Sequence, residues 1–155
     1  MSASTIRGPS MKLTDQQIRA LIEDRYIERG RAYMKAGQVE LTEITPRRVT
    51  AQCAGTRMYT VTLALTGGRL SGACTCPAVE DFGPCKHMAA TALTVQATMT
   101  GGGYAPSESF RSRKSQVSRI ERQLQRMSKA ELVALIIEMV PDDEALAYWL
   151  SDEIE

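Results

Sequence analysis

The sequence is poor in aromatic residues and contains one histidine and one tryptophan. Aromatics make up 5% of its 155 residues, so a folded core has to consist mainly of aliphatic, alanine and methionine side chains. No run of about 18 apolar residues occurs, which argues against a membrane span. No apolar run follows the early Arg7, which argues against a signal peptide. We therefore expect a cytoplasmic protein, with association with the nucleoid as a further option. In that compartment thiols stay reduced.

The net charge of +1 conceals an asymmetry along the chain. Residues 131–155 contain eight acidic residues and neither lysine nor arginine, a net charge of −8. The remainder of the chain therefore carries +9, and the pattern indicates a basic body followed by an acidic tail.

The pattern of apolar residues predicts an α+β fold. Residues 1–12 are expected to form a disordered leader, and the capping-box pair Thr14 and Gln17 predicts a helix that runs to Gly37. Gly30 within that helix indicates a close packing contact. Alternation over 39–41, 49–53, 59–65 and 70–74 predicts a small antiparallel meander.

The second half of the chain is predicted to be helical. An alanine- and methionine-rich segment without breakers predicts a helix over about 85–98, and the glycine-rich composition of 100–114 predicts a flexible linker. Residues 115–155 form a predicted helical extension, in which Ser128 and Glu131 open a helix over about 129–140. That helix is apolar nearly all round, so it has to be buried, either in this domain or against another chain.

Three of the four cysteines and the only histidine fall within 14 residues, as Cys74, Cys76, Cys85 and His87. Zinc prefers tetrahedral thiolate and imidazole ligands, and two cysteines one residue apart in a strand point to the same face. The prolines and glycine of residues 77–84 favour a compact return to Cys85. The sequence therefore predicts one Zn²⁺ site; a disulfide is the weaker alternative, because it leaves the histidine idle and the compartment opposes it.

Four protein ligands leave no position for a reactive water, so the predicted site is structural rather than catalytic. Glu80 and Asp81 lie in the same loop and would serve as a general base only if a ligand were lost. No second histidine is present to act with them. We expect solvated carboxylates, no enzymatic activity and no small-molecule substrate.

The spacing C-x-C-x(8)-C-x-H, with Pro77 and the string from Cys85 through Ala90, resembles the SWIM zinc finger family. The upstream stretch from Arg29 to Val39 is similar to bacterial members, so the resemblance covers about residues 20–100 and suggests a SWIM-like domain over 13–99. It implies that the four ligands bind zinc, and that the module binds DNA or other proteins. Members occur alone in bacteria and within helicases and transposases, and the present chain has neither helicase nor transposase motifs.

Basic residues near the finger and in the extension favour nucleic acid as the ligand. Residues 111–126 contain six basic residues and one acidic residue, a net charge of +5. Phosphate binding requires such a cluster, although a solvated helix face explains it about as well. The predicted contact residues are Arg57, Arg69, Lys86, Arg111, Arg113, Lys114, Arg119, Arg122 and Arg126.

A protein partner is the alternative, reached through the C-terminal helices, with the chain as an adaptor subunit of a larger helicase- or transposase-type assembly. The fourth cysteine, Cys53, shares a strand face with Val49 and Ala51. This position favours a buried small side chain over a sensor thiol.

Overall fold

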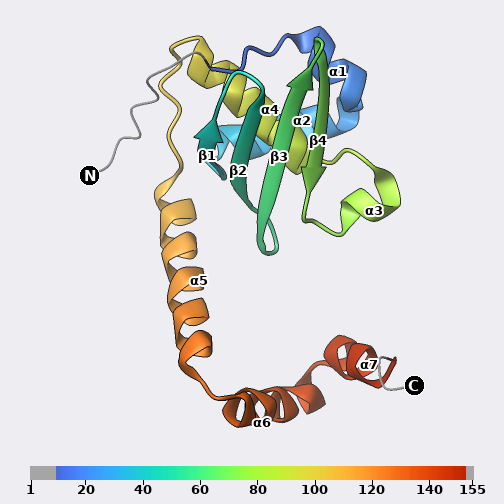
Figure 1. The fold of residues 1–155 in the computed structure, drawn as a ribbon, viewed down its shortest axis with the longest axis vertical. Helices are drawn as coiled ribbons and strands as arrows, with labels where there is room; N and C mark the ends of the chain where they lie inside the picture. Colours follow the sequence, from blue (N-terminus) through green and yellow to red (C-terminus); the bar gives the residue numbers. More distant parts are fainter. Residues whose placement is uncertain (1–9, 153–155) are drawn as a thin grey trace. The chain divides into compact units, whose positions relative to one another are not determined.

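The computed structural model describes residues 10–152 and divides the chain into two units, Met1–Ser112 and Arg113–Glu155 (Figure 1). The first unit contains α1 (Asp15–Leu21), α2 (Asp24–Lys35), β1 (Val39–Ile44), β2 (Arg48–Ala54), β3 (Met58–Thr66), β4 (Arg69–Cys74), α3 (Ala78–Phe82) and α4 (Lys86–Met99). Helix α5 (Glu108–Arg126) runs from the first unit into the second, which continues with α6 (Lys129–Met139), a 3₁₀ turn (Val140–Asp142) and α7 (Glu144–Asp152). The α+β class is confirmed.

The four strands form one antiparallel meander in the order β1-β2-β3-β4, as the alternation predicts. Alternate residues of β3, Tyr59, Val61 and Leu63, are buried, while their neighbours are partly exposed. Helix α4 packs across the sheet on this buried face, with α2 alongside it (Figure 1). The core therefore lies between the sheet and the α2–α4 pair.

Gly30 of α2 packs closely against α4, which confirms the predicted packing contact. A Cβ atom at position 30 would lie 2.6 Å from Cβ of Ala89 and 2.7 Å from the backbone nitrogen of Ala90. A side chain here would push the two helices apart, so the glycine sets the short distance between α2 and α4.

The N-terminal region differs from the prediction in two respects. Thr14 and Gln17 do form a capping box, but the helix that they open ends at Leu21. Ile22 adopts an extended backbone and is 1% exposed, so its burial in the core interrupts the helix, and α2 starts two residues later. The leader prediction falls mostly on residues 1–9, outside the described residues, but Met11 is fully buried and belongs to the core.

The segment predicted as a linker is attached to the first strand before the helical extension begins. The hydroxyl of Tyr104 accepts a hydrogen bond from the Val39 amide and donates one to the Val39 carbonyl oxygen, at 3.1 and 2.6 Å. The amide of Ser107 donates to the carbonyl oxygen of Gly37. Helix α5 begins at Glu108, so residues 108–114 are helical.

Helix α6 has the predicted bounds and the predicted capping box of Ser128 and Glu131. Of the two predicted ways of covering it, full burial within its own unit is not observed in the described residues. No residue of α6 is buried, and Ile137 is 63% exposed. Within its own unit, the apolar surface of this helix is therefore only partly covered. Within residues 10–152, no helix is both long enough and apolar enough to cross a membrane.

Candidate metal centre

The first two cysteines of the cluster lie where β4 ends. Cys74 is the last residue of the strand, and Cys76 follows in the loop with 4% of its surface exposed. Thr75 between them remains tied to β3, because its amide donates to the Thr60 carbonyl oxygen and its hydroxyl accepts from the Thr60 amide. This extended continuation keeps both thiols on the same side of the chain.

The other two members of the cluster lie at the start of α4. Cys85 is the N-cap residue of that helix, and His87 lies in its first turn. The connecting loop contains the short helix α3 and turns back at Gly83, whose φ of 73° is a left-handed conformation that favours glycine. The loop therefore returns the chain from the sheet to the helix within eight residues, as its composition predicts.

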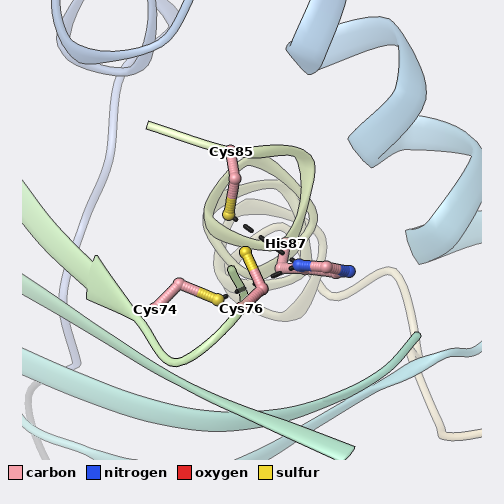
Figure 2. Close-up of side chains that lie close together, drawn as sticks. All are labelled: Cys74, Cys76, Cys85 and His87. Carbon is pink, nitrogen blue, oxygen red and sulfur yellow. Dashed lines mark hydrogen bonds between the residues drawn. The ribbon is translucent and has the colours of Figure 1, made fainter. Parts of the chain in front are cut away.

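The four side chains converge on one point (Figure 2). Their donor atoms all lie within 4.8 Å of one another, and three of the four residues are buried. Nδ1 of His87 lies 3.9 Å from Sγ of Cys74 and 3.8 Å from Sγ of Cys85. In a tetrahedral zinc site the nitrogen-to-sulfur edge is about 3.6 Å, given the usual metal–ligand distances. The donor set and its dimensions therefore fit a single metal ion of this kind.

The electrostatics of the three thiols also fit a cation. The hydrogen bond from Cys74 lowers the pKa of Cys85, and the same interaction raises the pKa of Cys74. Burial raises the pKa of Cys76. Without a cation, therefore, one thiol ionises readily. Its negative charge opposes ionisation of the other two thiols, since like charges at this separation repel. A bound divalent metal removes that repulsion.

The surroundings of His87 were not predicted. Its ring lies between Tyr33 and Tyr59, with centroids 5.4 and 4.9 Å away, and Gly55 is adjacent to it. Nδ1 faces the sulfurs, while Nε2 is buried and has no hydrogen-bond partner among the described residues (Figure 2). With Nδ1 as the ligand atom, Nε2 retains its proton in an aromatic enclosure. No sequence pattern links these three residues to His87, because they come from α2, β3 and the turn before it.

Cys53 is close to the cluster but does not belong to it. Its Sγ lies 3.7 Å from the His87 carbonyl oxygen and 3.6 Å from the Thr91 hydroxyl, and it is fully buried. Burial raises its pKa to about 12. The thiol is therefore neutral near pH 7, as a buried small side chain should be.

The predicted contact residues do not form one surface in the first unit. Arg57 precedes β3 and Arg69 follows its end, so the length of the nine-residue strand, about 30 Å, separates them. Lys86 places its ammonium group 4.7 Å from the centre of the Tyr33 ring. The remaining predicted residues, Arg111, Arg113, Lys114, Arg119, Arg122 and Arg126, all lie on α5. Glu80 and Asp81 lie in α3 and are exposed.

The fold and the cluster together define a class: a small α+β domain with a Cys₃His metal site between the end of a sheet and the start of a helix. Residues 59–96 match the family model of the SWIM zinc finger, so the resemblance is confirmed and the chain carries a SWIM zinc finger. The match spans β3, β4, the metal loop and most of α4. Searches of curated proteins and of solved structures returned no significant match.

Proposed function

We propose that this chain is a non-enzymatic binding module in which zinc has a structural role and the ligand is nucleic acid, DNA in particular. The closed donor set supports the structural role. Cys74, Cys76, Cys85 and His87 supply four ligand atoms, which is the full number for tetrahedral zinc and leaves no position for a reactive water. The metal would hold the end of the sheet against the start of α4. The nucleic acid would then be bound by surface residues of this scaffold and not by the metal.

The observation that supports nucleic acid most directly is the basic face of α5, which we define as Arg119, Arg122 and Arg126. All three are exposed and share one side of the helix at spacings of three and four residues. They line a groove of about 610 Å³ together with Gln123, Met127 and Glu131. Arginine binds phosphate oxygens through charge-assisted, often bidentate hydrogen bonds, so clustered arginines on one helix face are suited to contact a nucleic-acid backbone.

The proposal is tested by fluorescence anisotropy with the full, zinc-loaded chain and labelled double-stranded and single-stranded DNA. Affinity should fall steeply as salt increases, because binding releases counterions from the phosphates. Charge reversal of Arg119 and Arg122 to Glu should weaken binding at least tenfold and reduce the slope of the salt dependence by about one unit per lost contact.

Lys35→Glu is the matched control, because it reverses the charge of an exposed lysine on α2 that is not part of the basic face. Its effect should be small. Binding that is indifferent to salt, or that is weakened equally by the α5 variant and by Lys35→Glu, would overturn the assignment of the basic face. The absence of any DNA binding would overturn nucleic acid as the ligand.

A protein partner is the second candidate, with the chain as an adaptor in a larger DNA-processing assembly. The observation that favours it is the exposed apolar surface of α6, since such a surface on a soluble protein usually marks an interface. Recovery of the same stable complex with and without nuclease treatment would support this candidate over DNA binding.

A further inference from the structure

The four residues of the metal cluster differ in their access to solvent. Cys74 is partly exposed, whereas the other three are buried: Cys76, Cys85 and His87 are 4%, 3% and 4% exposed. Cys74 also lines an open groove of about 790 Å³ between the start of β3 and the metal loop. Cys76 borders the same groove but is nearly covered. A small reagent in solvent therefore reaches the sulfur of Cys74 first.

Cys85 is placed to react with a modified Cys74. The two thiols are hydrogen-bonded to each other, and their sulfurs lie within 4.8 Å. They come from different elements, because Cys74 ends β4 and Cys85 is the N-cap of α4 (Figure 2). A disulfide between them would join the same two elements that the metal joins.

The other two cysteines are less suited to this reaction. Cys76 follows Cys74 by two residues in an extended segment, which places their Cα atoms about 6.8 Å apart, at the upper limit for a disulfide. Cys53 is fully buried, and its sulfur is held against the His87 carbonyl oxygen and the Thr91 hydroxyl. Access and placement together therefore single out Cys74 and Cys85.

We propose that Cys74 is an oxidation site for hydroperoxides and that Cys85 resolves the oxidised sulfur, with release of the metal. The Cys74 thiolate attacks a peroxide oxygen: an S–O bond forms, the O–O bond breaks and hydroxide leaves, so two electrons pass from sulfur to the peroxide. The Cys85 thiolate then attacks the Cys74 sulfur: an S–S bond forms, the S–O bond breaks and a second hydroxide leaves. In sum, two thiolates and one hydrogen peroxide give one disulfide and two hydroxide ions.

The reaction removes two of the four donors of the metal site. Cys76 and His87 alone do not complete a tetrahedron, so zinc should dissociate. The disulfide keeps the end of β4 joined to the start of α4, so the fold should be retained, and a dithiol reductant with added zinc should restore the site. The proposal rests on zinc at this centre, which is part of the proposed function, and not on nucleic acid as the ligand.

The experiment treats the full, zinc-loaded chain with hydrogen peroxide and follows zinc release with a chromogenic chelator. One zinc should be released for each disulfide formed, and peptide mapping should find the pair Cys74–Cys85. In a parallel sample dimedone traps the sulfenic acid, and its adduct should lie on Cys74. Far-UV circular dichroism should be retained. Zinc content is measured before the peroxide is added, so a failure of the metal site is distinguished from a failure of this proposal.

Glu80→Trp and Asp81→Trp are a matched pair of variants on α3. Both residues are exposed, and of the two Glu80 lines the groove beside Cys74. Glu80→Trp should cover the groove and slow zinc release about threefold or more, whereas Asp81→Trp should leave the rate unchanged. Equal rates for the two variants would contradict access through the groove.

Cys53→Ala should release zinc at the wild-type rate, because its thiol takes no part in the reaction. Zinc that is retained in peroxide would overturn the proposal. So would a dimedone adduct on Cys76 or Cys85 in place of Cys74, and so would a disulfide between Cys74 and Cys76.

Discussion

Gly55 lies beside the Nε2 edge of His87, on the side of the ring that faces away from the sulfurs. A Cβ atom at position 55 would lie 3.0 Å from Nε2 of the His87 ring and 2.6 Å from Cε2 of Tyr59. The ring can therefore direct Nδ1 at the sulfurs only because the turn before β3 has no side chain at this position. Gly55 positions the imidazole although it is not a ligand.

We expect Gly55→Ala to lower zinc affinity about tenfold, the usual effect of disturbing a residue that supports a metal ligand. Competition with a chromogenic zinc chelator measures this directly. Val49→Ala is the control for general destabilisation, because it removes a fully buried side chain from the neighbouring strand at a cost of about 2 kcal/mol. Equal affinities for wild type and Gly55→Ala would contradict the positioning role.

Metal analysis of the purified protein should find about one zinc per chain, since the four donors form a single tetrahedral set. Cys85→Ala should abolish this binding and strongly lower the Tm, because metal binding and folding are coupled in small sites. Cys53→Ala removes the cysteine outside the cluster and should retain one zinc. A zinc content near zero in the wild type would refute the site itself.

Gly30→Ala should destabilise the protein by about 1–3 kcal/mol, although alanine is the better helix former. The added methyl group meets the backbone of α4, which cannot move without carrying Cys85 and His87 with it. Urea unfolding of the zinc-loaded protein measures the loss. Arg31→Ala, exposed on the same helix, should change stability by only a few tenths of a kcal/mol. Stabilisation by Gly30→Ala would show that the helices can separate at little cost.

The buried thiol of Cys53 should make stability fall at high pH. Its pKa is about 12 in the folded protein against an ordinary value of 9.0, so the unfolded chain releases this proton first. The stabilising contribution is fully present below pH 9 and is lost as the pH rises towards 12. Near pH 10 the wild type should therefore have lost about 1 kcal/mol more than Cys53→Ala, relative to neutral pH, in urea unfolding. Identical pH profiles for the two proteins would contradict this.

Local patterns determined much of the fold. Alternation predicted the four strands, both capping boxes opened the predicted helices, and the spacing of cysteines and histidine identified the metal cluster. These features depend on residues that are close together in the chain. The local interactions that produce each element can therefore be recognised directly in the sequence pattern. The break at Ile22 was missed because burial of that side chain in the core overrode continued helix formation.

The sequence by itself determined the ligand set and the order of the elements, because strand and helix periodicity, caps and metal spacing are local properties. Tertiary structure alone decided the surroundings of His87, in which Tyr33, Gly55 and Tyr59 come from separate elements. It also decided that the C-terminal unit leaves much of α6 exposed, since an apolar helix has no local property that says which surface will bury it. The metal cluster that the sequence predicted is thus enclosed by residues that only the packing of α2, α4 and the sheet brought to it.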